Sequence, residues 1–365
     1  MEQILREILS QIGEPDRDAI AQALARQESL AKPPHSLGKL EDISVKLAGM
    51  TGRLYNPVDR RRVLIFAADN GIVEEGVASC PQSVTLSQTI NFTRGLTGVA
   101  VLAKHFNTEL DVMDVGINAD FRQSGVRDLK IAHGTRNFAR EHAMTRTQAL
   151  QALQIGVDAA RRAADEGVQI IGVGEMGIGN TSTSSAVLST LLGLPAAQTV
   201  SRGAGINDEA YARKIAVIDE AIRRWQPDPS DPVDVLMKVG GFDLAAMCGA
   251  FLGAAVARMP AVIDGFISAV AALCAFQLNP LCAAYMIPSH ASAEKGYRLA
   301  MEAMRLEPML LMNMRLGEGS GCPIAFEIVA ASQSVLRDMA TFEEAAIDDG
   351  YLSEIRGNRT FLGEA

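Results

Sequence analysis

"VQIIGVGEMGIGNTSTSSAVLSTLLG", residues 168–193, joins a β-rich apolar run to a Ser- and Thr-rich helical pattern through a glycine-rich turn. Helical patterns with apolar residues at spacings of three and four also occur, as in residues 148–167 and 206–225. They separate further β-rich runs that end near Gly, Asp or Ser, at residues 63–71, 109–116, 261–265, 282–290 and 308–317. Because parallel strands need crossover connections, this alternation predicts an α/β fold with a mainly parallel, doubly wound (Rossmann-like) sheet covered by helices on both faces.

Both ends of the chain lack strong strand signals. The opening "MEQILREILSQIGEPDRD" has the apolar spacing of an amphipathic helix, and it carries acids where a signal peptide has a basic start. We therefore predict a large α/β catalytic domain over residues 28–325. A small helical domain is predicted to combine residues 1–27 with residues 326–365.

The composition narrows the class of protein and the kind of partner. The chain has 34 Lys and Arg against 43 Asp and Glu, a net charge of -9, and only 5% aromatic residues, so no nucleic-acid groove is expected. Its five cysteines are scattered and odd in number, which favours a reducing compartment and a cytoplasmic location. Polar residues and a proline interrupt the longest uncharged stretch, residues 265–293, so no membrane span is expected.

The glycine-rich turn contains G-x-G-x-x-G at Gly172, Gly174 and Gly177, a pattern typical of dinucleotide binding. That fingerprint also needs an acid about 20 residues further on to hold a ribose hydroxyl. No Asp or Glu occurs from residue 176 to residue 207. The start of the following helix instead suits a monophosphate, although a plain helix cap fits the spacing equally well. The residues concerned are Asn180, Thr181 and Ser182.

A second turn, "SRGAGIND" at residues 201–208, also precedes a helical pattern. It supplies backbone N–H donors without the lysine of a P-loop, so it is compatible with an anion but not specific for one. Lys214 lies two turns into that helix. Its ammonium group either adds positive charge to the cleft or is simply solvated.

Six acids lie at or beside the ends of predicted strands, where parallel strands gather their carboxyl ends in one cleft: Asp69, Asp114, Glu175, Asp243, Asp264 and Glu318. None of them stands in a metal-binding spacing, and the five histidines are spread along the chain. We therefore predict no metal site. No sequence signature of a covalent nucleophile is present either.

Glu318 differs from the other acids because glycines flank it in "NMRLGEGSGCP", residues 313–323. Flanking glycines let the backbone approach a ligand closely, and poor hydration raises a carboxyl pKa toward the range in which a general base works best. The alternative is a surface turn with one exposed acid. From spacing alone, that alternative is favoured.

Eight stretches, taken together and in order, decide between these interpretations. They resemble the nicotinate-nucleotide:dimethylbenzimidazole phosphoribosyltransferase family, which makes the lower-ligand nucleotide of cobalamin. The resemblance covers nearly the whole chain and departs from the family pattern at His35 and Asn70. The stretches are "KPPHSLGKLED" (32–42), "AADNGIVEEGVASCPQSVT" (67–85), "GEMGIGNTSTSSA" (174–186), "SRGAGIND" (201–208), "VGGFDLAAMCGAF" (239–251), "VIDGFISAVAAL" (262–273), "PSHASAEKGY" (288–297) and "MRLGEGSGCPIA" (314–325).

The resemblance implies a parallel sheet with flanking helices, a small helical domain built from both chain ends, and a homodimer. It implies transfer of a phosphoribosyl group from nicotinate mononucleotide to 5,6-dimethylbenzimidazole, with no cofactor. Glu318 occupies the position of the family's catalytic base, and Glu175 is a second acid that offsets positive charge on the ribose.

The reaction that the resemblance implies makes the remaining predicted site residues candidates for binding the substrates. Candidates for the phosphate and ribose are Gly177, Gly179, Asn180, Thr181, Ser182, Ser201, Gly203, Lys214, Asp243, Asp264, Ser292 and Arg315. Candidates for a flat apolar slot that holds the base are Pro81, Gln88, Met176 and Leu316.

Two other functions remain open at this point. The glycine fingerprint motivates a nicotinamide-dependent dehydrogenase, against which the missing ribose acid argues. A non-catalytic nucleotide-binding protein would keep the pocket but hold Glu318 away from any base. The sequence does not specify which lower-ligand base is preferred.

Overall fold

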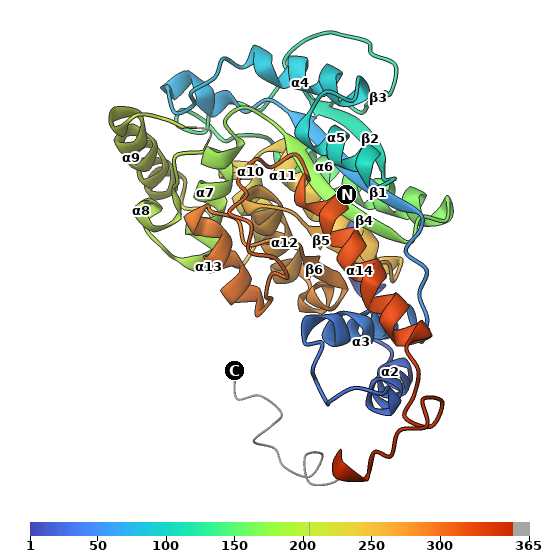
Figure 1. Cartoon of the computed structure of the whole chain (residues 1–365). Helices are drawn as coiled ribbons and strands as arrows, with labels where there is room; N and C mark the ends of the chain where they lie inside the picture. Colours follow the sequence, from blue (N-terminus) through green and yellow to red (C-terminus); the bar gives the residue numbers. More distant parts are fainter. Residues whose placement is uncertain (204, 353–365) are drawn as a thin grey trace. The chain divides into compact units, whose positions relative to one another are not determined.

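A computed structural model describes residues 1–203 and 205–352. Its sheet has six strands in the order β3-β2-β1-β4-β5-β6, and every neighbouring pair is parallel. Figure 1 shows β1 and β4 side by side near the middle of the sheet, with helices around it. The predicted α/β fold with a parallel sheet is thus confirmed. The strands are β1 (Arg61–Ala68), β2 (Glu109–Gly116), β3 (Val126–Asp128), β4 (Ile170–Met176), β5 (Ala261–Ile263) and β6 (Met286–Pro288).

Fourteen α-helices and three short 3-10 helices are assigned within the described residues. The 3-10 helices are η1 (Gly71–Glu75), η2 (Pro280–Tyr285) and η3 (Gly350–Leu352). The α-helices are α1 (Glu2–Ser10), α2 (Arg17–Ser29), α3 (Lys39–Thr51), α4 (Ser83–Thr93), α5 (Gly98–His105), α6 (Arg146–Asp165), α7 (Asn180–Leu192), α8 (Ala196–Thr199), α9 (Asp208–Trp225), α10 (Pro232–Val239), α11 (Phe242–Val256), α12 (Phe266–Leu278), α13 (Lys295–Met304) and α14 (Gly321–Asp338).

The core of the sheet-containing part is built around α11. This helix is apolar on nearly all sides and buried along almost its whole length, because it contacts the sheet and also packs against α6 and α12. Glycines allow the closest contact: a Cβ added at Gly156 of α6 or at Gly249 of α11 would overlap backbone atoms of the other helix. The two helices therefore meet backbone to backbone.

The chain forms two compact units. The first combines Met1–Gly13 with Arg60–Ala325, and the second combines Glu14–Asp59 with Phe326–Ala365. Compared with the predicted bounds, residues 1–13 group with the sheet, because Asn279 Nδ2 donates to Leu9 O at 3.0 Å and Tyr285 Oη donates to Gly13 O at 2.9 Å. Residues 28–59 group with the second unit instead of the first.

The second unit is held together by contacts between segments far apart in sequence. Helices α2 and α3 pack against each other, and Gln27 Nε2 donates to Ser44 Oγ at 2.9 Å. Arg26 donates to the carbonyl oxygens of Leu336 and Met339, both at 3.0 Å. Most of the buried positions of α2 are alanines, which suits a small core.

Two strand predictions need correction. Residues 308–317 form no strand; a single bridge joins His290 to Leu310, and Leu311 is 86% exposed. Residues 282–290 contain the end of η2 before the short strand β6. In a sequence, an apolar run such as residues 308–317 indicates a buried strand, whereas in the structure part of this run is exposed. Among the described residues, no helix is both long and apolar enough to cross a membrane.

Candidate active site

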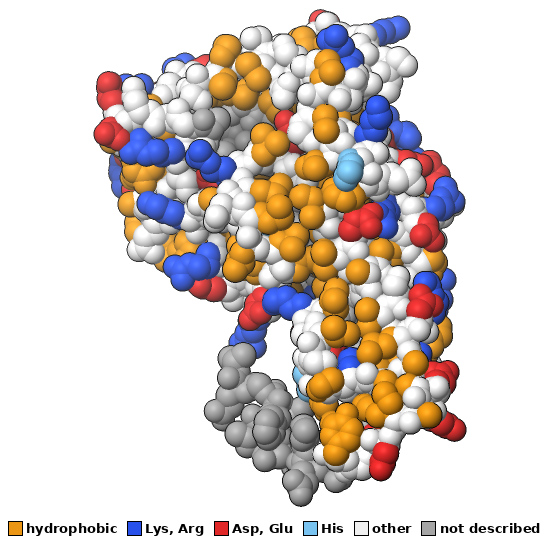
Figure 2. Space-filling model, viewed as in Figure 1, with side chains coloured by type: hydrophobic (Ala, Val, Ile, Leu, Met, Phe, Trp, Pro, Cys, Tyr) orange, Lys and Arg blue, Asp and Glu red, His pale blue; other side chains and the backbone are white. Residues whose placement is uncertain are grey.

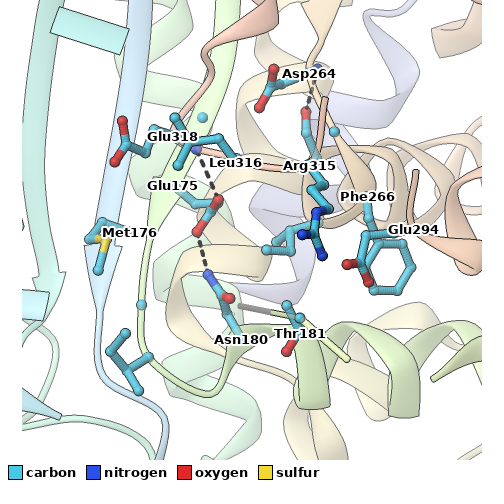
Figure 3. A pocket seen from close by; sticks show the side chains of 18 of the residues that line it. Glu175, Met176, Asn180, Thr181, Asp264, Phe266, Glu294, Arg315, Leu316 and Glu318 are labelled. Carbon is cyan, nitrogen blue, oxygen red and sulfur yellow. Dashed lines mark hydrogen bonds between the residues drawn. The ribbon is translucent and has the colours of Figure 1, made fainter. Parts of the chain in front are cut away.

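A cavity of about 690 Å³ opens at the carboxyl ends of the strands. The strand order reverses between β1 and β4, and ligands of open α/β sheets bind in the crevice at such a point. Residues at the end of β4 and just after β5 form part of its wall. The rest comes from segments far away in sequence, including the turn at residues 315–318 (Figure 3).

The Glu318 side chain reaches the N-terminus of α5. Its Oε2 accepts a hydrogen bond from Val99 N at 3.1 Å, and its Oε1 accepts one from Gln88 Nε2 at 3.3 Å. The residue is only 5% exposed, and burial raises the pKa of its carboxyl while these hydrogen bonds oppose the rise. Glu318 is therefore a buried carboxylate on the cavity wall, and the alternative of an exposed surface turn is wrong.

Two other buried acids hold the turn that carries Glu318. Glu175 Oε1 accepts a hydrogen bond from Glu318 N at 3.2 Å, which Figure 3 draws as a dashed line. Asp264 Oδ2 and Oδ1 accept from Gly319 N at 3.0 Å and from Gly321 N at 2.7 Å. The backbone at Glu318 is left-handed, with φ 63°, so these bonds stabilise a conformation that a non-glycine residue rarely adopts.

Gly174 of β4 makes this arrangement possible. A Cβ at this position would lie 2.6 Å from Glu318 O and 2.7 Å from the Cα of Gly319. The third-to-last residue of β4 must therefore be glycine for the turn to lie against the strand. The fingerprint glycine that suggested a dinucleotide thus serves close packing of the turn.

Three buried carboxyl groups gather at one wall of the cavity: Glu175 and Asp264 line it, and Asp243 lies behind them. Burial raises the pKa of Glu175 to about 8, and nearby Asp243 adds to the rise. Burial likewise raises the pKa of Asp243 and of Asp264, each to about 7. Asn180 Nδ2 donates to Glu175 Oε2, so the start of α7 is tied to the same cluster. A positive charge that arrives in the cavity favours the ionised, carboxylate form of these groups.

The raised pKa of Glu175 predicts a pH-dependent stability difference. The folded chain keeps the proton between the ordinary value of 4.5 and about 8, whereas the unfolded chain has released it. The stability that Glu175 contributes is fully present below its pKa in the unfolded chain. It is lost as pH rises from that pKa to the pKa in the folded chain. Glu175→Gln does not titrate at this position. As pH rises through the window, we therefore expect the unfolding free energy of the variant to increase relative to that of the wild type by up to about 1.4 kcal/mol per pH unit.

Urea unfolding of both proteins at pH 5, 6.5 and 8 measures this difference. Glu302→Gln is the control, because Glu302 lies at the exposed surface in an ion pair with Arg298. A gap between Glu175→Gln and the wild type that stays constant with pH would contradict the buried, protonated carboxyl.

The other end of the cavity collects donors for an anion. Thr181 at the start of α7, Gly203 and Ser292 line it, and the exposed Arg315 points its guanidinium toward this end (Figure 3). Lys214 is 1% exposed and lies just behind, where its Nζ donates to Thr181 Oγ1 at 2.8 Å. Burial lowers the pKa of Lys214 to about 8. The solvated alternative for Lys214 is therefore wrong.

The cavity includes most, but not all, of the predicted site residues. Those that line it are Gln88, Glu175, Met176, Gly177, Asn180, Thr181, Gly203, Asp264, Ser292, Arg315, Leu316 and Glu318. Those that do not line it are Pro81, Gly179, Ser182, Ser201, Lys214 and Asp243. Asp243 is fully buried behind Gly177, and Ser201 accepts a hydrogen bond from Lys295 N.

Several residues that line the cavity were not predicted as site residues from the sequence. Among them, Glu294 carries a charge and Phe266 has the largest side chain. Both lie in stretches that carried the family resemblance, at residues 288–297 and 262–273, so the signal was present without an assigned role. Of the two departures from the family pattern, Asn70 is buried behind Gly177 and His35 lies in the second unit. Among the described residues, no cluster of three or more His, Cys, Asp or Glu has the arrangement of a metal site.

A doubly wound parallel sheet with a cavity at the carboxyl ends of its strands defines an α/β protein that binds a small ligand there. A family model described as "Phosphoribosyltransferase" matches residues 12–347. The chain is 50% identical over 359 residues to the nicotinate-nucleotide–dimethylbenzimidazole phosphoribosyltransferase of Clostridium perfringens, covering 98% of this chain and 99% of that protein. The protein of the same name from Geobacter sulfurreducens is 43% identical over 348 residues, covering 95% and 99%.

A solved structure indicates the same family as these sequence relatives. The crystal structure of CobT from Thermus thermophilus matches with a TM-score of 0.88 at 38% identity, over 91% of this chain and all of that one. This chain therefore belongs to the nicotinate-nucleotide–dimethylbenzimidazole phosphoribosyltransferase family.

Proposed function

We propose that this chain transfers the 5-phosphoribosyl group from nicotinate mononucleotide to 5,6-dimethylbenzimidazole, in the assembly of the cobalamin nucleotide loop. The products are α-ribazole 5′-phosphate and nicotinate. The names of relatives that are up to 50% identical over nearly the full chain support this proposal. The observation that carries it is the Glu318 carboxylate, which is buried on the wall of the cavity and has a raised pKa.

The leaving group needs little help from the protein. In nicotinate mononucleotide the ring nitrogen is a pyridinium bonded to C1′, so cleavage of that bond returns its electron pair to the ring and releases a neutral nitrogen. No general acid has to protonate it. The residues of the site therefore act on the sugar and on the incoming base.

Glu318 acts on the incoming base. As the bare nitrogen of dimethylbenzimidazole bonds to C1′, its ring becomes cationic and the proton on the other nitrogen becomes acidic. Glu318 takes that proton, a step that general base catalysis typically accelerates by ~100-fold to 10,000-fold. Attack from the face opposite the departing nicotinate converts a β-glycoside into an α-glycoside, with inversion at C1′.

The remaining residues bind the phosphate and the base and stabilise charge on the ribose. The carboxyl group of Glu175, with Asp243 and Asp264 behind it, offsets positive charge that develops on the ribose ring. The donors around Thr181, with Lys214 and Arg315, hold the 5′-phosphate, because helix N-termini and cations favour an anion. Met176 and Leu316 form the apolar walls beside Glu318 that hold the planar base.

Incubation of the purified chain with the two substrates tests the proposal. We expect mass spectrometry to detect α-ribazole 5′-phosphate and nicotinate in equal amounts. Absence of both products, with nicotinate mononucleotide still bound, would favour the non-catalytic nucleotide-binding protein. Oxidation of NADH in place of this reaction would favour the dehydrogenase.

We also propose that the chain works as a homodimer in the cytoplasm. Its five cysteines are all free, which suits a reducing compartment. Large apolar side chains are exposed just before and on α5 and in the segment that precedes Glu318. Figure 2 shows hydrophobic side chains gathered in the middle of the face in view. Single exposed apolar residues are common, but a contiguous group indicates an interface. In this proposal the interface includes Leu96 (61% exposed), Val101 (56%), Leu311 (86%), Met312 (48%) and Leu316 (59%), of which Leu316 packs against Gly98 at the start of α5.

Leu311→Asp is expected to convert the dimer into a monomer, because it places a charge in a desolvated interface. Sedimentation at micromolar concentration measures the change. Ile4→Asp is the control, since Ile4 is 41% exposed on α1, outside this apolar group. A wild-type chain that sediments as a monomer would contradict the dimer.

A further inference from the structure

Glu294 is a cavity residue for which neither the fold nor the mechanism above supplies a role. It is the N-cap residue of α13, yet its side chain makes no capping hydrogen bond. It is 9% exposed and lines the cavity, and its Oε2 has no hydrogen-bond partner among the described residues. Figure 3 shows it at the same end of the cavity as Thr181, Phe266 and the guanidinium of Arg315.

An unpartnered buried carboxylate oxygen is unfavourable unless something binds it, because the group has lost water without gaining a donor. Lys214 is close enough for its charge to interact with Glu294, but the Lys214 Nζ donates to Thr181 Oγ1 instead. No ion pair within 4.0 Å joins Glu294 to a described cation. The acceptor is therefore left for a ligand that carries a donor.

The chemistry of the two proposed substrates leaves one class of donor. The phosphate is an anion and is repelled by a carboxylate, and the nicotinate ring has no N–H group. The N–H of dimethylbenzimidazole is needed at Glu318, which Figure 3 shows apart from Glu294 on the far side of the Arg315 guanidinium. The ribose hydroxyls are donors, and a carboxylate is an acceptor with two oxygens.

We propose that Glu294 accepts hydrogen bonds from the vicinal 2′- and 3′-hydroxyls of the nucleotide and makes the site specific for ribose. This assignment rests on the proposed function and deepens it. Binding of the diol at Glu294 and of the phosphate at the start of α7 fixes the sugar at two points. C1′ then lies between Glu175 and the base held beside Glu318.

The test compares nicotinate mononucleotide with its 2′-deoxy and 3′-deoxy analogues. The wild type is expected to prefer the ribonucleotide by ~100-fold or more in kcat/KM, because a site built to bind a hydroxyl rejects the analogue that lacks it. Glu294→Ala is expected to reduce that ratio to below ~10-fold, mainly by slowing the ribonucleotide. Glu294→Gln, which keeps one acceptor oxygen, is expected to lie between the two and serves if the alanine variant does not fold.

The ratio separates recognition from a structural role. A residue that only supports the fold would slow all three substrates equally and leave the ratio unchanged, and that result would overturn the proposal. So would a wild type that accepts the deoxy analogues as well as the ribonucleotide. Glu302→Gln, the same substitution on the exposed side of α13, is expected to keep the wild-type ratio. Product formation from the ribonucleotide by the wild type tests the proposed function separately, whatever the ratio.

Discussion

Glu318→Gln is expected to lower kcat by ~100-fold to 10,000-fold while nicotinate mononucleotide still binds. Glutamine has nearly the same shape as glutamate, and its amide oxygen can still accept the hydrogen bond from Val99 N. It cannot take a proton from the benzimidazole ring. The loss should therefore fall on the chemical step and leave substrate binding largely intact.

The pH profile gives this prediction a second readout. Burial raises the pKa of Glu318, and the base works only as the carboxylate, so wild-type kcat should fall as pH falls through a value above that of an ordinary glutamate. The residual rate of Glu318→Gln should lack that limb. Turnover close to that of the wild type, or an unchanged profile, would remove Glu318 from its role. Glu302→Gln again controls for removal of one negative charge.

Gly156→Ala is expected to lower the free energy of unfolding by about 2 kcal/mol. The new methyl group would overlap the carbonyl oxygen of Ala246 and lie 2.6 Å from Ala250 N, so α6 and α11 must move apart. Overpacking costs about 1–3 kcal/mol, and an overlap with backbone atoms places this substitution at the upper end, about 3 kcal/mol. The higher helix propensity of alanine returns about 1 kcal/mol of that loss.

Urea unfolding with an unchanged m-value measures the effect. Gly249→Ala should behave in the same way, because its methyl group would overlap the carbonyl oxygen of Leu153 on the opposing helix. Gly13→Ala is the matched control: its nearest neighbour, Arg258 Nη1, would lie 3.8 Å from the new Cβ, and no strained backbone is involved. If all three variants were equally stable, the backbone-to-backbone contact of α6 and α11 would be refuted.

Local patterns predicted much of the fold and some of the site. The runs that became β1, β2 and β4 are seven or eight residues long, and helices lie between them along the chain. The strand-end rule correctly brought Glu175 and Asp264 to one cleft, whereas Glu318 reaches that cleft from a turn that follows no strand. It failed for the run at residues 308–317, because apolar character does not distinguish a buried strand from an exposed segment.

Other features had no local signal. Three-residue strands such as β3 are too short to show a period. Glu294 follows Ala293 in an ordinary helix start, and only the packed structure shows that its carboxylate faces a cavity and not solvent. Similarly, nothing near residue 13 predicts that α1 belongs with the sheet, since the contacts come from Asn279 and Tyr285.

The amino-acid sequence by itself determined the alternation of strand and helix, and with it a parallel sheet whose strand ends meet at one edge. It also carried the family, through motifs that do not depend on coordinates. Tertiary structure alone decided which acids are chemically unusual. A carboxyl pKa depends on lost water and on nearby donors, and for Glu318 these come from distant segments such as Val99, 219 residues earlier in the chain. Spacing along a chain contains no measure of that burial.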